Sequence, residues 1–302
     1  MPEACDNARA PNDTALIMTH PEYILTLSCI DQRGIVLRVA GFLAEHGCNI
    51  IDSAQFGDPE SQLFFMRVHF ALEDAGVADA DLRGAFAALC EANGMRGQLH
   101  DAGAKPRVLI MVSKIGHCLN DLLFRHRLGA LPIDIRAVVS NHADFARLVG
   151  SYEIPFHHWP VEPGTKGEAE GRLVDLLERE RIELVVLARY MQVLSPDLCR
   201  RLEGKAINIH HSFLPSFKGA RPYHQAAERG VKVIGATAHY VTADLDEGPI
   251  IEQDTARVDH TMDAAALTAI GRDTESAVLA RAVLWHAERR VLVDGRKTVV
   301  FR

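Results

Sequence analysis

The chain has 302 residues, a formal net charge of −7 and an isoelectric point near 6.1. Because nucleic-acid-binding proteins gather positive charge on one face, this balance argues against a nucleic-acid partner. Hydrophobic residues make up 48% of the chain, yet no apolar run reaches the length of a membrane span, so we expect a globular protein with no membrane partner. The length exceeds that of one typical domain, and two domains are expected.

The first twenty residues are polar and acidic, and they lack the basic start and apolar core of a signal peptide. We therefore expect residues 1–20 to form a disordered tail and the protein to be cytoplasmic. Six cysteines are scattered along the chain without a C-x-x-C pair or metal-ligand spacing, which fits a reducing compartment. A catalytic thiol is the less favoured alternative.

A first domain is predicted over residues 21–102. Alternation of apolar and polar residues predicts a strand at Tyr23–Cys29. Helical spacing of apolar residues follows over Val36–Leu43, and Gly47 ends that helix as a C-cap glycine does. The remaining elements are expected at Asn49–Phe56 and Leu63–Phe70 (strands), Leu82–Cys90 (helix) and Met95–His100 (strand). The order β-α-β-β-α-β predicts a ferredoxin-like fold.

Two short motifs in this domain resemble the ACT family. They are the turn Asp31-x-x-Gly34-Ile-Val and the segment Gly47-Cys-Asn49-Ile that opens the second strand. The resemblance implies a domain that pairs with a second copy across a sheet edge, hence a homo-oligomer, and binds a small amino acid at that interface.

A regulatory amino-acid site is therefore expected at Asp31, Gly34 and Asn49. Gly34 leaves backbone N–H groups free at a helix entrance for a carboxylate, and Asp31 can receive an ammonium group. The alternative is a dimerisation module without a ligand.

Residues 103–106 are expected to be a linker, after which strands and helices alternate. Runs such as Val108–Val112 are apolar on both faces, as in a parallel sheet covered on both sides. Residues 107–302 should therefore form an α/β domain with a Rossmann-like, mostly parallel sheet. Strands are expected at Val108–Ser113, Ile133–Ser140, Glu183–Ala188 and Ala206–His210, and helices at Cys118–Leu128, Ala143–Gly150, Lys166–Arg181 and Pro196–Leu202.

The last part of the chain, from residue 221, departs from this alternation of strands and helices. A helix is expected at Arg221–Arg229, followed by two antiparallel strands at Lys232–Thr242 and Ile250–Val258. Between these strands lies an acidic loop with Asp244, Asp246 and Glu247. A long helix at Ala264–Glu288 and a strand near Val299 complete the prediction.

Asn208 and His210 are the most informative pair of residues. Side chains two apart on a strand point the same way, and this strand ends where open α/β sheets place their ligand crevices. An amide beside an imidazole can polarise a carbonyl and stabilise the oxyanion formed when it is attacked. On its own the pattern fits a structural role equally well.

The residues that follow resemble the folate-dependent formyl-transferase family over residues 107–302. The matching signature reads Asn208-x-His210-x-Ser-x-Leu-Pro-x-Phe-x-Gly219, then Gly235-x-Thr-x-His239-Tyr-Val-x-x-x-Leu-Asp246-x-Gly-Pro-Ile-Ile251. The resemblance implies that Asn208, His210 and Asp246 are catalytic and that His239 supports Asp246.

The expected chemistry follows from these residue types. Asn208 can donate to the formyl oxygen of 10-formyltetrahydrofolate, and His210 can stabilise the oxyanion. Asp246 can orient a water and accept its proton, provided that the pocket raises its pKa. No metal and no cofactor are expected, because the histidines lack zinc-motif spacing; they are His157, His158, His210, His211, His224 and His239.

The folate pocket is expected along two segments. One follows the strand at Val185–Ala188 and consists of Tyr190, Met191, Gln192, Val193 and Leu194. The other supplies backbone contacts to the pterin from Thr242, Ala243, Asp244 and Leu245. The alternative is that Met191, Val193 and Leu194 belong to the core.

The acceptor of the formyl group is the remaining question. Transformylases of this family carry a glycine-rich phosphate loop after the first strand, but here Ser113–Leu119 holds a single glycine. Members that act on transfer RNA carry a further C-terminal domain, and this chain ends after the core. Members with an N-terminal ACT domain use water.

The resemblance therefore implies hydrolysis of 10-formyltetrahydrofolate to tetrahydrofolate and formate, which feeds purine synthesis and balances the one-carbon pool. A transferase with another acceptor and a catalytically silent folate or amino-acid sensor are the alternatives.

Overall fold

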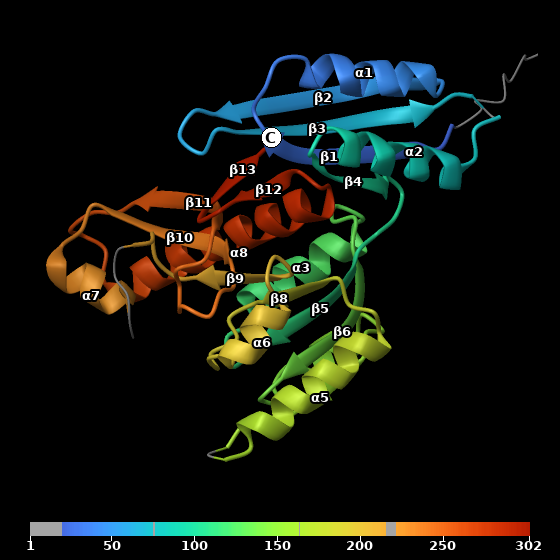
Figure 1. Cartoon of the computed structure of the whole chain (residues 1–302). Helices are drawn as coiled ribbons and strands as arrows, with labels where there is room; N and C mark the ends of the chain where they lie inside the picture. Colours follow the sequence, from blue (N-terminus) through green and yellow to red (C-terminus); the bar gives the residue numbers. More distant parts are fainter. Residues whose placement is uncertain (1–19, 75, 163, 216–221) are drawn as a thin grey trace, which may run out of the picture.

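The computed structural model describes residues 20–74, 76–162, 164–215 and 222–302. The predicted tail and the start of the helix expected at Arg221 lie outside these residues. An N-terminal four-stranded sheet with two helices packs beside a larger α/β unit, and the last strands of the chain lie between the two (Figure 1). In the described part of the chain, no helix is both long and apolar enough to cross a membrane.

The N-terminal unit has the predicted ferredoxin-like order. Its elements are β1 (Glu22–Ile30), α1 (Ile35–Glu45), β2 (Cys48–Asp58), β3 (Leu63–Leu72), α2 (Asp79–Ala92) and β4 (Arg96–Asp101). The strand order is β2-β3-β1-β4, with every neighbouring pair antiparallel, so β2 is an edge strand. Gly47 follows the C-cap residue His46 of α1 and has a φ of +66°, the left-handed conformation typical of a glycine that ends a helix.

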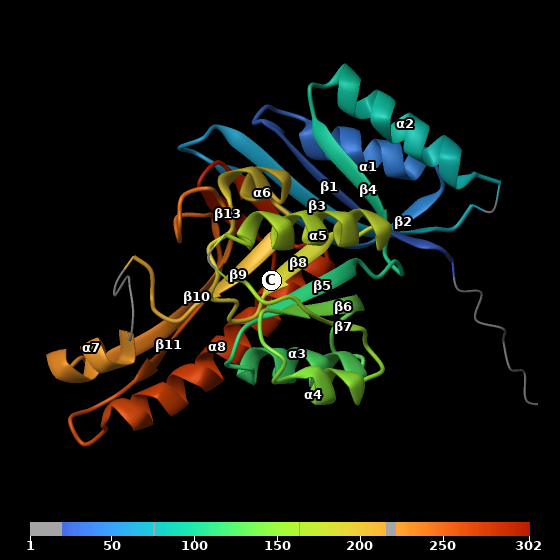
Figure 2. The same ribbon diagram turned by 90° about the horizontal axis from the view of Figure 1, so that it is seen from below.

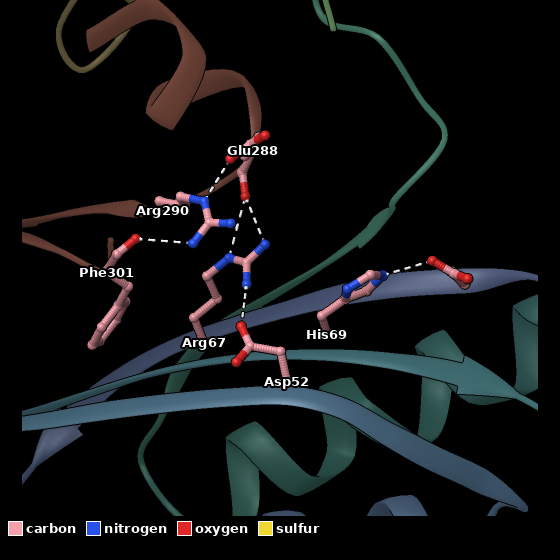
Figure 3. A network of polar contacts seen from close by, with 7 residues as sticks. Asp52, Arg67, His69, Glu288, Arg290 and Phe301 are labelled. Atoms are coloured by element: carbon pink, nitrogen blue, oxygen red, sulfur yellow. Dashed lines mark hydrogen bonds and ion pairs between the residues drawn. The ribbon is translucent and has the colours of Figure 1, made fainter. Parts of the chain in front are cut away.

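The two faces of this sheet have different partners. Met66, Val68 and Phe70 of β3 pack with α1 and α2 in one apolar core. Since strand side chains alternate, Arg67 and His69 lie on the opposite face, which is turned toward the C-terminal part of the chain (Figure 3).

The larger unit is built on a seven-stranded sheet of order β11-β10-β9-β8-β5-β6-β7. Its first elements are β5 (Arg107–Val112), α3 (His117–Arg127), β6 (Asp134–Ser140), α4 (Ala146–Gly150), β7 (Phe156–His158), α5 (Lys166–Arg179), β8 (Leu184–Leu187), α6 (Pro196–Arg201) and β9 (Ala206–His210). The later ones are α7 (Pro222–Arg229), β10 (Val233–Tyr240), β11 (Ile250–Arg257), α8 (Ala264–Ala287), β12 (Val291–Asp294) and β13 (Lys297–Val300).

The sheet is parallel from β7 to β9, and β10 and β11 are antiparallel, which confirms the predicted mostly parallel α/β fold. Helices cover both faces (Figure 2). Val108, Ile110 and Val112 of β5 pack with α3 and α8, whereas Leu109 and Met111 pack with α5 and α6. This explains the run of apolar residues in β5, since neither face meets water.

Two strands were not predicted. β7 has three residues, too few to show a periodicity, and β12 pairs with β13 in a hairpin. This hairpin contacts the turn between β2 and β3: Lys297 Nζ lies 2.8 Å from Glu60 and 3.1 Å from Asp58, and Ser61 Oγ donates to Asp294 at 2.9 Å.

A buried arginine joins the two units at the end of α8 (Figure 3). Arg67, only 4% exposed, donates from Nε and Nη2 to the main-chain oxygen of Glu288 at 3.2 and 3.1 Å. Its Nη1 donates to Asp52 Oδ2 at 3.2 Å. Because the last carbonyls of a helix have no partner within the helix, Arg67 acts as a C-terminal cap supplied by another sheet.

Candidate active site

A cavity of about 590 Å³ opens at the carboxyl ends of β5, β8 and β9. This is where the strand order reverses, because β5 is followed outward by β6 and β7 while β8 returns to its other side. Ligands of open α/β sheets bind at such a switch point. The cavity is lined by Asn208, His210, His239 and Asp246, so the structure brings the four residues together.

Asn208 and His239 face each other across paired strands. β9 and β10 place the two residues opposite one another, and Asn208 Nδ2 lies 3.3 Å from His239 Nε2. His239 Nδ1 is 2.8 Å from the main-chain oxygen of Tyr240, so Nδ1 carries a hydrogen that it donates there. In neutral His239 the other nitrogen is then an acceptor, and Asn208 donates to it. This arrangement fixes the orientation of the Asn208 amide.

Asp246 lies between two histidines. Its Oδ2 is 3.3 Å from His210 Nδ1, and its Oδ1 is 3.6 Å from His239 Nε2. His210 Nε2 is buried and has no hydrogen-bond partner among the described residues, so it is available to a ligand. Both contacts match the predicted grouping around Asp246.

The expected raised pKa of Asp246 is wrong. Burial works to raise the pKa of this carboxyl, but its contacts with His210 and His239 outweigh burial and bring the pKa below its usual range. The close approach of His210 and His239 to the two carboxylate oxygens accounts for the difference. Asp246 is therefore ionised at neutral pH.

The loop that carries Asp246 has a demanding backbone. Asp246 adopts φ +57°, a conformation that aspartate and asparagine tolerate better than most residues. Gly248 lies directly against the preceding strand, since a Cβ there would come within 1.7 Å of the Tyr240 carbonyl oxygen. Any larger residue would push the loop away from His239.

Two residues that we did not single out hold the segment after His210. Thr237 Oγ1, fully buried, donates to Ser212 O at 2.9 Å and accepts from Leu214 N at 3.1 Å. Gln253 donates from Nε2 to Thr237 Oγ1 and to Leu214 O, at 2.9 and 3.2 Å. Thr237 is part of the signature, and its position in the strand next to β9 is the sequence feature that could have singled it out. The part of the signature over residues 216–221 lies outside the described residues.

The predicted folate segments border the same cavity. Met191 and Val193 are each 57% exposed and line it, so these two side chains are not core, whereas Leu194 belongs to the apolar cluster under α5 and α6. Tyr190, Gln192, Thr242, Ala243 and Leu245 also line the cavity. Asp244 is exposed and does not line it.

A polar wall that the sequence reading missed closes one side of the cavity. Glu275 of α8, 1% exposed, contacts His117 Nε2 at 2.8 Å, accepts from the Tyr223 hydroxyl at 2.6 Å and pairs with Arg189 Nε at 3.4 Å. Burial works to raise the pKa of Glu275, but His117, Arg189 and Tyr223 together lower it. We call Arg189, His117, Tyr223 and Glu275 the polar wall.

Two residues of the polar wall, His117 and Glu275, form a candidate metal group together with Cys118. Ligand atoms of His117, Cys118 and Glu275 lie within 4.8 Å of one another. Burial raises the pKa of the Cys118 thiol far above its usual value, and the Arg189 charge stands beside Glu275. A protonated thiol and a neighbouring cation do not suit a metal ion.

The predicted amino-acid site is divided in a single chain. Asp31 and Gly34 lie at one end of the N-terminal sheet, where Asp31 Oδ2 is 3.0 Å from the position that a Cβ on Gly57 would take. Asn49 is eight residues before Gly57 on β2, which corresponds to roughly 26 Å along an extended strand.

Comparison with known proteins covers both units. Residues 106–283 match the family model described as formyl transferase, and residues 23–84 match the ACT domain. A formyltetrahydrofolate deformylase of Corynebacterium sp. (strain P-1) is 52% identical over 93% of this chain and 98% of its own.

Solved structures agree. The crystal structure of formyltetrahydrofolate deformylase from Burkholderia mallei is 51% identical, with a TM-score of 0.89 over 93% of this chain and 100% of that one. A glycinamide ribonucleotide transformylase from Symbiobacterium toebii covers 66% of this chain, at 29% identity and a TM-score of 0.60.

The fold and the grouped Asn208, His210 and Asp246 thus define a formyl-transferase catalytic unit joined to an ACT unit. The transformylase matches the catalytic unit only partly, whereas the two deformylases match almost the whole chain. The chain belongs to the formyltetrahydrofolate deformylase family.

Proposed function

We propose that this protein hydrolyses 10-formyltetrahydrofolate to tetrahydrofolate and formate. The observation that supports it most directly is the grouping of Asn208, His210 and Asp246 on one cavity, with His210 Nε2 unpaired among the described residues. Relatives named for this activity match over 93% of this chain.

Asn208 and His210 act on the formyl oxygen. The free hydrogen of the Asn208 amide donates to it, because the other is directed to His239. His210 Nε2 lies on the same cavity; in the cationic ring, whose Nδ1 donates to Asp246, Nε2 also carries a hydrogen and stabilises the negative charge that develops on that oxygen. Two fixed donors cost little reorganisation during the reaction.

Asp246 orients the attacking water and takes its proton. A carboxylate of low pKa is a weak base toward free water, but the water becomes strongly acidic as its oxygen bonds to the formyl carbon. The proton then passes to N10 as the carbon–N10 bond breaks, which releases formate and tetrahydrofolate. The two histidines keep the carboxylate ionised and in place for the first step.

Folate binds between the two loops that line the cavity. Met191, Val193 and Leu245 are exposed apolar side chains at its rim, and they offer flat contacts for the pterin and benzoyl rings. The exposed Asp244 contributes through its backbone, which already shapes the loop by accepting from Thr242 Oγ1 at 2.9 Å.

The test of this function compares water with another acceptor. Purified protein and 10-formyltetrahydrofolate should give formate and tetrahydrofolate in equal amounts, and added glycinamide ribonucleotide should leave that ratio unchanged. Faster transfer to glycinamide ribonucleotide than to water would falsify the assignment. Binding of folate without turnover would favour the silent sensor.

We infer further that the ACT unit forms a homodimer through β2. This edge strand is exposed over most of its length and presents Ile50, Ile51 and Phe56, which are 40%, 51% and 45% exposed. Edge strands with free N–H and C=O groups pair readily with another strand. Antiparallel pairing centred on Ser53 would place Asn49 of one protomer opposite Gly57 of its partner, beside Asp31 of that partner.

Dimerisation would therefore complete an amino-acid site that one chain leaves divided. Sedimentation should show a dimer that Ile50→Lys with Ile51→Lys converts to a monomer, whereas Phe124→Lys, exposed on α3, should not. Turnover should then change several-fold with one of the common amino acids, glycine and methionine being tried first, as expected for a coupling of about 1–3 kcal/mol. A response that survives both Asp31→Asn and the monomeric variant would place the effector elsewhere.

A further inference from the structure

Arg189 is the least explained residue of the cavity. It follows β8, lines the cavity and is only 9% exposed, yet the hydrolytic steps above do not use it. Its backbone has φ +65°, a conformation that is unfavourable for any residue with a branched or long side chain. Because glycine would adopt it freely, the arginine side chain is kept here at a conformational cost, and such strain points to function.

The Arg189 guanidinium is incompletely matched. Its Nε lies 3.4 Å from Glu275, but that nitrogen makes no hydrogen bond among the described residues. Glu275 is meanwhile shared with His117 and Tyr223. A buried guanidinium on a cavity wall, whose Nε has no hydrogen-bond partner among the described residues, is suited to a planar anion, which arginine binds through two parallel hydrogen bonds.

The charges of this side of the cavity favour an anion. Among the described residues that line the cavity on this side, Arg189 and the exposed Arg272 are cations and Glu275 is the one acid. His211 lies between this wall and the reacting groups, with its ring 5.1 Å from that of His210 and 6.4 Å from that of Tyr223. Burial, then the charge of Arg189, lowers the pKa of His211 to about 4, so His211 is neutral at pH 7.

We propose that the polar wall is a binding site for a small planar anion, and that in turnover it receives formate. The inference rests on the proposed function, which produces formate beside Asp246. Because Asp246 is an ionised carboxylate, the new anion is repelled from the reaction centre, and Arg189 lies on the wall that His211 separates from it. The polar wall thus holds formate away from Asp246, the carboxylate beside which formate is produced.

The experiment measures inhibition by formate and by nitrate, a planar anion that cannot be a product. Ionic strength is held constant with gluconate, which is too large for the site. Both anions should inhibit the native protein, and Arg189→Gly should weaken this inhibition roughly ten- to hundred-fold, as expected for lost hydrogen bonds to a charged group. The KM for the folate substrate should stay within about threefold. Glycine suits the backbone at this position, so the variant removes the side chain without adding strain.

Two further variants make the result decisive. Arg281→Met on α8 removes an arginine that pairs with Asp254 and does not line the cavity, and it should leave inhibition unchanged. Arg189→Gly with Glu275→Gln avoids an unpaired buried carboxylate and should bind anions as weakly as the single variant. Equal inhibition of the native protein and Arg189→Gly, or no inhibition at all, overturns the proposal.

The melting temperature separates this inference from the proposed function. Nitrate should raise the melting temperature of the native protein and not that of Arg189→Gly, whether or not substrate is hydrolysed. If no formate is released but nitrate still stabilises through Arg189, the anion site stands and the hydrolase does not. If formate is released and neither anion stabilises the native protein, the reverse holds.

Discussion

Asp246 gains its properties from the two histidines on either side of it. Their contacts keep it ionised despite partial burial, and its left-handed backbone brings both carboxylate oxygens toward them. Asp246→Asn keeps the shape and the backbone preference but removes the charge and the proton acceptor. Formate release should fall roughly 10²–10⁴-fold, typical of general-base loss. Folate binding, measured by fluorescence, should persist, and near-normal turnover would contradict the proposed role.

The low pKa of Asp246 also sets the sign of a stability effect. A carboxyl whose folded pKa lies below its unfolded value of about 3.9 stabilises the protein above that pH. The contribution is lost as the pH falls through 3.9 toward the folded pKa. The difference in unfolding free energy between the native protein and Asp246→Asn should thus shrink as the pH falls below about 4. A difference that instead grows on acidification would show that the pKa is raised.

Residues of this site differ in how far the sequence could reveal them. Asn208 and His210 are two apart on a short strand, so alternation alone places them together. Glu275 lies inside a long helix whose apolar spacing gives no hint of a buried acid, and Arg189 occupies a loop whose left-handed backbone no local pattern announces. Asn49 could not be separated from Asp31 without knowing the strand order, which places them at opposite ends of the sheet.

Among the elements, the loop between β10 and β11 positions the catalytic carboxylate of Asp246. Gly248 allows it to lie against Tyr240, and a methyl group there has no space. Gly248→Ala should therefore displace Asp246 by a fraction of an ångström to an ångström and lower turnover on the order of 10²-fold, because misplacement of that size has such effects. The melting temperature should change little. Gly171→Ala, likewise outside the left-handed region but with open space around the added Cβ, provides the control, and equal losses in both would contradict a role for the close approach of Gly248 to Tyr240.

Sequence patterns predicted most elements because burial on one or both faces leaves a clear periodicity. α8 is predicted to within one residue at its end, and β1 and β3 alternate as expected. The β12–β13 hairpin was missed although Asp294-Gly295 stands between two apolar segments, a strong hairpin signal. β7 could not be found, since its three residues owe their extended form to pairing with β6.

At the scale of the whole molecule, Arg67 joins the ACT sheet to the catalytic unit. Arg67→Met keeps most of the side-chain volume but leaves the Glu288 carbonyl without its cap and Asp52 without its partner. Hydrogen bonds to charged groups contribute about 1.5–3 kcal/mol, so the melting temperature should fall by several degrees. Arg83→Met is the control, because the hydrogen bonds that Arg83 makes among the described residues go to Asp79 and Leu99 of the ACT unit.

The same variant should also alter communication between the units. If an amino acid bound at the ACT unit changes turnover, Arg67→Met should reduce that response while Arg83→Met preserves it. Calorimetry of effector binding distinguishes a lost site from a lost connection, since binding itself should remain in Arg67→Met. An unaltered response would show that the units communicate through the β12–β13 hairpin instead.

The 24 residues of α8 form a rod of about 36 Å, with Arg67 holding one end and Glu275 at its centre. A rigid helix of this kind transmits some movements of the ACT sheet to Glu275 and does not transmit others. Sliding of the ACT sheet along the helix axis would carry Glu275 through the full distance, because a hydrogen-bonded helix does not shorten. Tilting of the sheet would rotate the rod about its middle and leave Glu275 almost in place. The direction of a domain movement, rather than its size, would then decide whether Glu275 and the cavity wall are displaced.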